Sequence, residues 1–374
     1  LHIGHSYTTV VCDVIARYKK LRGYDVFYLT GTDEHGEKVQ IKAEEAGLTP
    51  QAFVDGIVDK IKDLWKTLDV DYDKFIRTTD DYHCESVQKI FSKFLEQGDI
   101  YKDNYEGWYC TPCESFWTDT QVGEEHVCPD CGRPVKKAAE PAYFFKTNAF
   151  LDRLNAYFDK EGTILPSIRK NEMINTFIKP GLTDLCVTRT SFDWGIKINE
   201  DPKHVIYVWL DALFNYLSAL GYKTKNDELF QKFWQSEDSE VIHIVGADIT
   251  RFHTIYWPDF LMAQGLRLPD KVFVHGLLMT KDGKMSKSKG NVISPFPLIE
   301  RYGIDAFRYY LVREINFGDN GQFTPEQFIE RTNMDLVNNY GNLLSRSVSM
   351  IIKYFGGIVP EYLNSKTAFD DELD

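Results

Sequence analysis

The chain has 374 residues and a formal charge of −13, from 43 Lys and Arg against 56 Asp and Glu. This acidic balance argues against a protein that coats nucleic acid without specificity, because such binding needs clustered cations to neutralise phosphates. The sequence contains no run of about 18 apolar residues that could cross a membrane. Its N-terminus lacks the basic and apolar segments of a signal peptide.

The first hundred residues predict alternating helices and strands. Apolar residues recur at helical spacing over residues 5–22, and Gly23 is suited to end that helix. Residues 25–30 predict a buried strand with the polar turn GTDEHG at its carboxyl end, and helical segments follow to about Gly98. This order is typical of one half of a doubly wound parallel sheet.

The middle of the chain differs in composition from its flanks. Residues 101–145 are rich in Tyr, Gly, Pro and Cys, as expected of short strands and knuckle turns. Strand-like and helical segments resume near His204, and a long helix is predicted over residues 325–355. The simplest prediction is an α/β nucleotide-binding fold with a doubly wound parallel sheet, split by an inserted module.

The sequence His2-Ile3-Gly4-His5 lies at the start of the first predicted helix. A helix N-terminus has unpaired N–H groups and a partial positive charge, so it attracts phosphate. Gly4 would let a ligand approach the backbone, and two imidazoles on one side could stabilise charge on a phosphate under attack. By itself, however, the pattern favours a helix-capping turn with two incidental histidines.

A second motif, Lys284-Met285-Ser286-Lys287-Ser288, lies between Gly283 and Gly290, so a mobile loop is expected. Ammonium groups on such a loop could close over a triphosphate. A run of lysines alone is more typical of a solvated loop. The pairing of this motif with HIGH, roughly 280 residues earlier, is unlikely to arise by chance.

Four of the seven cysteines have the spacing of metal ligands: Cys110, Cys113, Cys128 and Cys131. Two CxxC pairs separated by 14 residues can bring four thiolates around one Zn²⁺, and four cysteine ligands close the shell, so the metal would be structural. The alternative is four reduced cysteines without metal. Either way, the pattern favours a reducing compartment over a disulfide framework.

HIGH together with KMSKS resembles the signature pair of the class I aminoacyl-tRNA synthetases. Further strings are similar to the methionyl-tRNA synthetase family, bacterial type: GTDEHG (31–36), YVWLDAL (207–213), GADITRFHTIYWP (246–258) and VFVHGLL (272–278). The resemblance covers nearly the whole chain. It implies a cytoplasmic ligase that activates L-methionine with ATP and Mg²⁺ and transfers it to tRNA(Met), including initiator tRNA.

The resemblance also implies a domain order. The expected parts are a Rossmann-like catalytic domain in two halves (1–102 and 204–275), a connective insertion with a zinc knuckle (103–203), a KMSKS loop and stem-contact region (276–323), and the start of a helical anticodon-binding domain (324–374). The family has a strand before HIGH and more helix after residue 374. We therefore expect a chain truncated at both ends, with any homodimer formed through a C-terminal region that is absent here.

The site residues follow from the same resemblance. Those expected at ATP are His2, Gly4, His5, Gly246, Asp248, His275, Gly276, Lys284, Met285, Ser286 and Lys287, among which His2, His5, Lys284 and Lys287 would be catalytic. Asp33 is expected to hold the ammonium group of methionine. The methionine side chain would contact Trp209, Leu213, Tyr216, Phe252, His253 and Tyr256, although such an aromatic group alone is more typical of ordinary core. One departure is Ala247, where the family usually has lysine.

Asn342 and Arg346 stand four residues apart on the last helix, hence on one face. The residues alone favour a solvated helix face. The resemblance implies instead that the amide and the guanidinium bind anticodon bases.

Two alternatives remain open. One is a sister class I synthetase, for leucine, isoleucine, valine or cysteine. The branched-chain enzymes carry a far larger editing insert, and a cysteine enzyme would hold zinc in its catalytic pocket through scattered ligands. The other is a non-catalytic tRNA-binding relative, against which the intact HIGH and KMSKS argue.

The lysine loop leads to a first prediction. Changing Lys287 to Ala should lower the rate of ATP–pyrophosphate exchange strongly while leaving methionine affinity little changed, because this charge is needed mainly in the transition state. Steady-state kinetics and equilibrium dialysis with methionine measure the two quantities. An equal loss of ground-state methionine binding would contradict the prediction.

Overall fold

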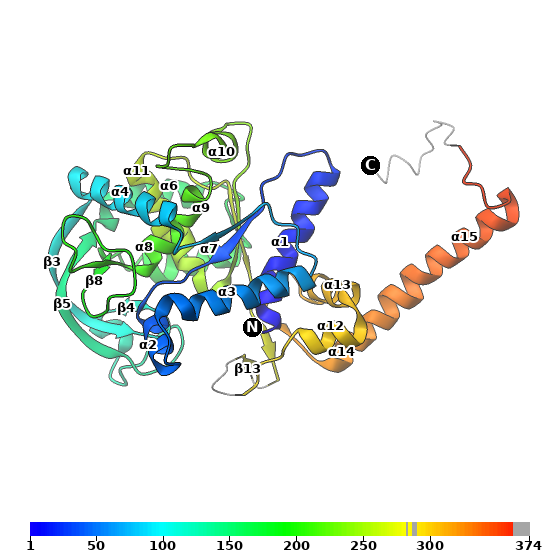
Figure 1. Cartoon of the computed structure of the whole chain (residues 1–374), viewed down its shortest axis with the longest axis horizontal. Coiled ribbons are helices and arrows are strands. Elements are labelled where there is room, and N and C mark those ends of the chain that lie inside the picture. Colours follow the sequence, from blue (N-terminus) through cyan, green and yellow to red (C-terminus); the bar gives the residue numbers. More distant parts are fainter. Residues whose placement is uncertain (282, 286–289, 362–374) are drawn as a thin grey trace.

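The computed structural model describes residues 1–281, 283–285 and 290–361 (Figure 1). Within these residues no helix is both long and apolar enough to cross a membrane. The first helix, α1 (Ile3–Leu21), buries Ile3, Tyr7 and Val10 on one face. It is followed by Gly23, whose φ of 85° lies in the left-handed region that favours glycine. The helix predicted over residues 5–22 is therefore confirmed.

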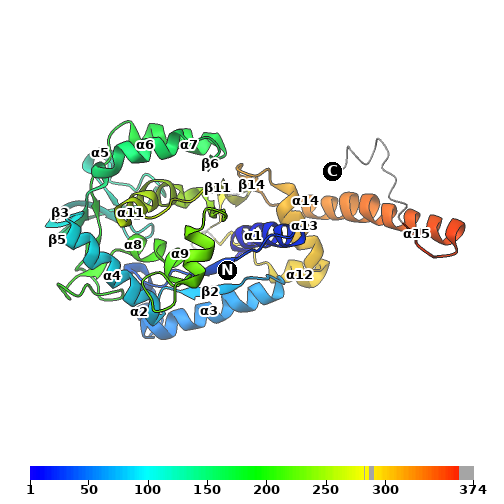
Figure 2. The ribbon, with the colours of Figure 1, turned by 90° about the horizontal axis from the view of Figure 1, so that it is seen from above.

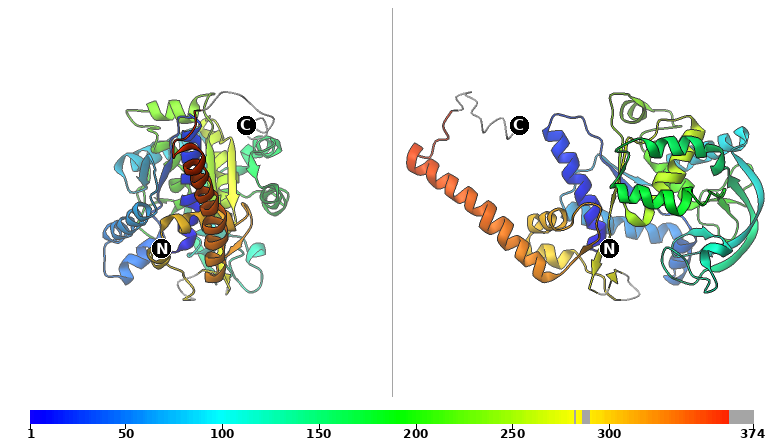
Figure 3. Two further views of the ribbon diagram at one scale, coloured as in Figure 1. Left: turned by 90° about the vertical axis from the view of Figure 1, so that its right-hand side faces the viewer. Right: turned by 180° about the vertical axis from the view of Figure 1, so that it is seen from behind.

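Parallel strands form the centre of the molecule. β1 (Leu29–Thr32) pairs in parallel with β2 (Lys74–Arg77). A second parallel group has the order β10 (Ile242–Gly246), β11 (Lys271–His275) and β6 (Ile164–Leu165). Helices cover both sides of these strands, with α6 and α7 on one side and α3 on the other (Figures 2 and 3). The predicted α/β class with a Rossmann-type arrangement is confirmed.

Two sequence predictions near β1 were wrong in detail. The strand predicted over 25–30 begins only at Leu29, the first residue in register with β2. The carbonyl of Tyr28 accepts from the backbone N–H of Asp73 at 2.9 Å. The N–H of Tyr28 is instead satisfied by the Asp73 carboxylate at 2.7 Å. The all-helical prediction up to Gly98 missed β2, since four residues are too few to show a period.

The helices of the parallel part have clear local causes. In α3, for example, Thr49 caps the N-terminus by accepting from Ala52 N at 3.3 Å, and Pro50 occupies the first turn. The helices between β1 and β11 are α2 (Glu37–Glu45), α3 (Pro50–Thr67), α4 (Asp81–Gln97), α5 (Asp119–Val122), α6 (Leu151–Asp159), α7 (Ser167–Met173), α8 (Val208–Leu213), α9 (Asn215–Ser218), α10 (Glu228–Phe230) and α11 (Trp257–Gln264). Shorter 3₁₀ or π-helical segments are Thr147–Phe150, Ile174–Ile178, Gln231–Gln235, Ala247–Ile249 and Phe252–Tyr256.

An antiparallel sheet with strand order β4-β3-β5-β7 occupies the middle of the chain. Its strands are β3 (Ile100–Cys110), β4 (Ser115–Trp117), β5 (Lys136–Phe145) and β7 (Leu185–Cys186), with β8 (Thr188–Arg189) and β9 (Val205–Ile206) pairing beside it. β3 and β5 are long rather than short, which corrects the expectation of short strands throughout 101–145. β6, from within the predicted insertion 103–203, belongs to the parallel sheet, so this range is not structurally separate throughout.

The part of the described chain that begins at Leu278 contacts α1 through β12 (Leu278–Thr280) and α13 (Ile304–Glu314). It comprises β12, β13 (Gly283–Lys284), α12 (Phe296–Tyr302), α13, β14 (Gly321–Gln322), α14 (Pro325–Arg331), a π-helical segment (Thr332–Gly341) and α15 (Asn342–Phe355). One apolar cluster joins α1, α3, α13 and α14, while a larger one joins α4, β5, α9 and α11. The helix predicted over 325–355 is confirmed; it projects away from the body (Figures 1 and 3).

Asp13 connects three segments of the chain, which are α1, the backbone at Asp71 and α13. Its carboxylate is fully buried on α1 and accepts from Arg17 Nε at 2.9 Å and from the backbone N–H of Asp71 at 2.7 Å. It also pairs with Arg308 of α13. A buried carboxylate with this many donors replaces its lost hydration and ties the first and last parts of the fold together.

Changing Asp13 to Ala should lower the free energy of unfolding by about 3 kcal/mol, because it leaves the largely buried Arg308 without its charge partner. Urea denaturation followed by circular dichroism measures this change. Asp25→Ala is a matched control, since Asp25 pairs with Lys232 at the surface and an exposed pair contributes at most about 1 kcal/mol. Equal effects of the two substitutions would contradict the prediction.

Candidate active site

The N-terminal turn of α1 meets the carboxyl ends of β10 and β11. Gly246 and His275 are register partners at the ends of these two strands. His275 Nδ1 lies 2.8 Å from the carbonyl oxygen of Gly276, so it carries the ring proton, and Nε2 accepts from the Thr8 hydroxyl at 2.7 Å. Burial lowers the pKa of His275. A neutral imidazole therefore fastens α1 to the strand ends.

Other groups approach two of the predicted glycines closely, and at Gly276 the approach of backbone requires glycine. A Cβ atom on Gly276 would overlap the backbone carbonyl of Asp319, and one on Gly246 would lie 2.7 Å from Asp248 Oδ1. Asp248 itself is exposed at the mouth of this region. The bare backbone at the strand ends suits a flat ligand. The carboxyl ends of the strands are the usual binding position in doubly wound sheets.

The two histidines of HIGH cap α1. His2 Nδ1 accepts from the backbone N–H of Gly4 at 3.1 Å, and His5 Nδ1 accepts from the N–H of His2 at 3.2 Å. In the neutral rings the proton then lies on Nε2, so each imidazole has an Nε2–H group to donate. The ring centroids are 3.9 Å apart. The capping turn and the phosphate-binding interpretation are therefore compatible, because the caps use only Nδ1.

The KMSKS segment begins beside this turn. Met285 is buried, and its Cε would lie 3.6 Å from a Cβ atom on Gly4. The backbone N–H of Ile3 donates to the carbonyl of Ile293 at 3.0 Å. Ser286 and Lys287 lie outside the described residues, as does the side chain of Lys284. Met285, at the start of the second motif, thus lies next to the first motif.

The predicted aromatic residues come together from α8, α9 and the π-helical segment Phe252–Tyr256. The rings of Trp209 and Phe252 are stacked with centroids 3.7 Å apart, and Tyr256 lies 5.8 Å from Phe252. Tyr216 Oη lies 2.8 Å from His253 Nε2. Leu213 is fully buried in the large apolar cluster. Trp209 and Tyr216 remain partly accessible.

A second histidine, His243 on β10, was missed by the sequence reasoning. His253 Nδ1 donates to the carbonyl of Ile249 at 3.0 Å, so its Nε2 accepts from Tyr216. His243 Nε2 accepts from Trp257 Nε1 at 3.1 Å, and its ring lies 4.4 Å from that of Tyr216. Burial lowers the pKa of His253 to about 4 and that of His243 to about 3. Both rings are neutral. The aromatic group, defined as Trp209, Tyr216, Phe252, His253 and Tyr256, therefore carries no charge.

Asp33 lies just beyond the end of β1 and is exposed to solvent. The surrounding protein excludes much of the water near its carboxyl group, and the charges of Asp211, Glu114 and Glu34 act in the same direction. Together they raise the pKa of Asp33 well above its usual value. A position where several carboxylates converge favours the arrival of a cation.

Asp211, another residue that the sequence reasoning did not single out, is fully buried next to this position. Its carboxylate accepts from His35 Nδ1 and from His83 Nε2, each at 2.7 Å. Burial opposes its ionisation, but the two imidazoles outweigh burial and lower the pKa of Asp211. His83 Nδ1 in turn accepts from Ser218 Oγ at 2.7 Å. The network fixes His35, two residues after Asp33.

The four predicted cysteine ligands are adjacent in space. Their sulfur atoms all lie within 4.8 Å of one another, and Cys110 Sγ is 3.7 Å from Cys131 Sγ. Four thiolates around zinc at about 2.3 Å require separations of about 3.8 Å, so the residues fit a tetrahedral ion. The turn is closed by Cys128, whose N–H donates to Arg133 O and whose carbonyl accepts from Gly132 N, both at 2.8 Å.

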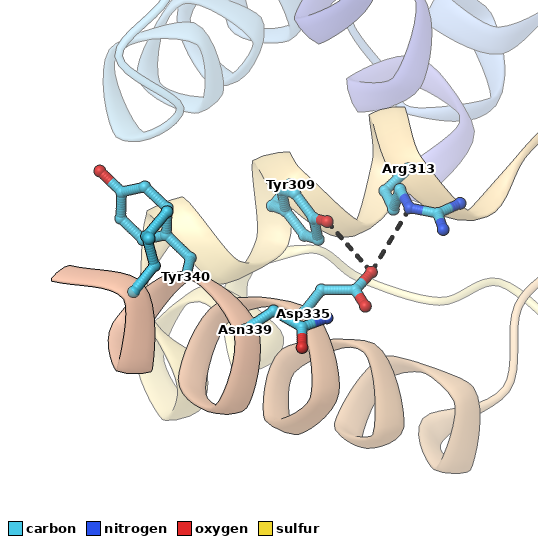
Figure 4. A pocket seen from close by; sticks show the side chains of 6 residues that line it. Tyr309, Arg313, Asp335, Asn339 and Tyr340 are labelled. Atoms are coloured by element: carbon cyan, nitrogen blue, oxygen red, sulfur yellow. Dashed lines mark hydrogen bonds and ion pairs between the residues drawn. The ribbon is translucent and has the colours of Figure 1, made fainter. Parts of the chain in front are cut away.

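Asn342 and Arg346 are exposed on α15, away from the body. An open hollow of about 400 Å³ lies at the base of this helix, as Figure 4 shows. There Asp335 accepts from Tyr309 Oη at 3.0 Å and lies 3.4 Å from Arg313 Nε. No residue predicted for ATP or methionine lines it.

A family model described as tRNA synthetases class I (M) matches residues 1–141 and 132–348. The chain belongs to this family. The methionine–tRNA ligases of Clostridium tetani and Bacillus subtilis are 60% and 56% identical to it over the whole chain, which spans 57% of the length of each. The chain covers 73% of Mycobacterium tuberculosis methionyl-tRNA synthetase bound by methionyl-adenylate, with 41% identity and a TM-score of 0.90.

The neutral histidines lead to a pH prediction. An unfolded histidine binds a proton below its usual pKa of about 6.5, whereas folded His253 does so only near 4. Between these two pKa values the unfolded state therefore binds more protons than the folded state. The free energy of unfolding falls as the pH falls from 7 to 5, by about 2 kcal/mol for one such group. His253→Gln should make this dependence shallower by about that amount.

Urea denaturation at a series of pH values measures this dependence. His126→Asn is the control, because His126 is exposed and its φ of 50° is one that asparagine tolerates. The control should keep the slope of the original protein. An unchanged slope in His253→Gln would show that His253 already takes up its proton at the usual pH.

Proposed function

We propose that the protein is a methionyl-tRNA synthetase, which forms methionyl-adenylate and pyrophosphate from L-methionine and ATP and then transfers methionine to tRNA(Met), including initiator tRNA. The observation that carries the proposal is the contact of the HIGH turn of α1 with Met285, where the KMSKS segment begins. An uncharged aromatic group, in which the pKa of Tyr216 is raised by burial and by the charges of Cys12 and Asp33, supports it. The homologues named methionine–tRNA ligases support it.

Methionine would bind with its ammonium group at Asp33 and its side chain in the aromatic group. The thioether has no charge, so it is recognised by shape and by contact of the polarizable sulfur with rings. Trp209, Tyr216, Phe252, His253 and Tyr256 would provide these contacts, with Leu213 behind them. The neutral state of His253 keeps this end of the site free of charge, while the carboxylates around Asp33 favour the ammonium at the other end.

ATP would lie across the ends of β10 and β11. Gly246, His275 and Gly276 would face adenosine, with Asp248 at the ribose hydroxyls. The phosphates would lie at the N-terminus of α1, near His2, Gly4 and His5, and under the segment that contains Lys284, Met285, Ser286 and Lys287. The methionine carboxylate attacks the α-phosphorus in line and pyrophosphate leaves. The Nε2–H groups of His2 and His5 and the ammonium groups of Lys284 and Lys287 would stabilise the negative charge, and Mg²⁺ would accompany ATP.

The cysteine cluster would hold a structural Zn²⁺ through Cys110, Cys113, Cys128 and Cys131. When bound, the ion cross-links the two turns of a small module that has little apolar core of its own. The closed set of four thiolates leaves no position for substrate. We assign the metal to folding of the knuckle.

The proposal includes the domain order predicted from the sequence, namely 1–102, 103–203, 204–275, 276–323 and 324–374. The second range contributes β6 to the parallel sheet. Asn342 and Arg346 would bind bases of the tRNA anticodon by hydrogen bonding and stacking. Their exposure on the projecting helix supports this role. We place the reaction in the cytoplasm.

ATP–pyrophosphate exchange with single amino acids tests the proposal. Methionine should support exchange, and homocysteine a weaker one, because an apolar pocket discriminates a missing methyl group by only about 1–3 kcal/mol. Asp33→Asn should raise the KM for methionine on the order of a hundred-fold, since breaking a desolvated charge pair costs about 2–5 kcal/mol. Asp63→Asn, exposed on α3, is the control. Exchange with another amino acid but not with methionine would overturn the proposal.

A further inference from the structure

The helix that follows the Asp33 turn has no cap from its own N-cap residue. α2 begins at Glu37 after Gly36, which has a φ of 115° and no side chain to accept from the first N–H groups. The N–H of Gly36 itself donates to the carbonyl of Trp194 at 3.1 Å. The first turn of α2 therefore needs a partner from elsewhere.

Glu114, which follows the second cysteine of the knuckle, lies against this turn. A Cβ atom on Gly36 would overlap Glu114 Oε1, so the carboxyl group is in close contact with the residue that precedes α2. A carboxylate at a helix N-terminus is favoured by the unpaired N–H groups and by the helix dipole. Gly36 is the residue that leaves room for it.

The backbone of Glu114 is held in a conformation that serves this contact. Its φ of 51° is uncommon for a residue with a side chain, and its carbonyl oxygen accepts from the buried Tyr207 hydroxyl at 2.6 Å. Oε1 is buried and has no hydrogen-bond partner among the described residues. Such strain and burial persist only where the surrounding structure enforces them.

Two more contacts join the knuckle to the same turn of α2. Glu37 accepts from Thr111 Oγ1 at 3.4 Å and pairs with Lys136 Nζ. Thr111 lies within the first CxxC pair, and Lys136 follows the second pair by five residues. Both halves of the knuckle therefore hold the helix whose preceding residues are Asp33, Glu34 and His35.

We propose that Glu114 is a positioning residue that fixes the start of α2, so that the fold of the cysteine knuckle sets the position of Asp33 for the substrate ammonium group. This inference rests on the proposed function, in which Asp33 binds the ammonium of methionine. Glu114 acts through α2 and through the turn from Asp33 to Gly36, and it does not contact the reacting atoms. It gives the knuckle a part in amino acid binding that is exerted through α2.

The test compares Glu114→Ala, Glu114→Gln and the control Glu124→Ala, an exposed acid of the same module. Glu114→Ala should raise the KM for methionine on the order of ten-fold, the size of a partly buried helix-terminus charge interaction. The kcat and the KM for ATP should stay within about two-fold, because the ammonium is bound equally in the ground and transition states. Glu114→Gln keeps an acceptor oxygen and should recover most of the loss. Zinc content should be the same in all variants.

Hydrogen exchange provides a readout that does not depend on activity. The amides at the start of α2 should exchange faster in Glu114→Ala than in the original protein or in Glu124→Ala. An unchanged KM with retained zinc, or unchanged exchange at these amides, would overturn the inference. Loss of zinc with a parallel fall in kcat would also overturn it, since it would assign Glu114 to knuckle stability. Absence of methionine-dependent pyrophosphate exchange in the original protein would instead reject the proposed function, while the amide measurement would still decide the role of Glu114.

Discussion

The candidate site depends on the close approach of the α1 N-terminus to the ends of β10 and β11. The hydrogen bond between Thr8 and His275 joins residues 267 positions apart in the sequence. Gly246 and Gly276 present bare backbone at the same strand ends. The helix N-terminus, the glycines and the buried Met285 thereby share one small volume. Each of these features is weak as a signal by itself, and together they define a place for a phosphorylated ligand.

The distribution of charge around this point is equally constrained. Burial keeps His243 and His253 neutral, so the aromatic side of the site is apolar although it contains two histidines. Asp211 stays ionised because it accepts from both His35 and His83. The difference in polarity between the aromatic residues and the carboxylates near Asp33 supports the proposed binding of an amino acid with an uncharged side chain and a free ammonium group. This distribution of charge follows from burial and pairing rather than from the number of charged residues.

The sequence predicted the elements whose signals are local. HIGH at the start of α1, the CxxC pairs and the long C-terminal helix are recognisable from spacing and capping chemistry alone, and the structure has all three. β2 and β6 were missed because strands of four and two residues have no period to detect, and they form only through pairing with distant segments. Asp211 and His243 were missed for a related reason. A single polar residue inside an apolar string gives no sign of its partner, and theirs lie on other elements.

The cysteine module shows why a residue outside the reaction can still matter to it. Its own apolar cluster contains only four buried residues, of which two are the cysteines Cys110 and Cys128. So small a cluster gives a turn little rigidity by packing alone, and the proposed Zn²⁺ would supply the missing cross-link. The module nevertheless places Glu114, with its uncommon φ of 51°, against Gly36. Under the proposal, order at the start of α2 would therefore follow order in the knuckle.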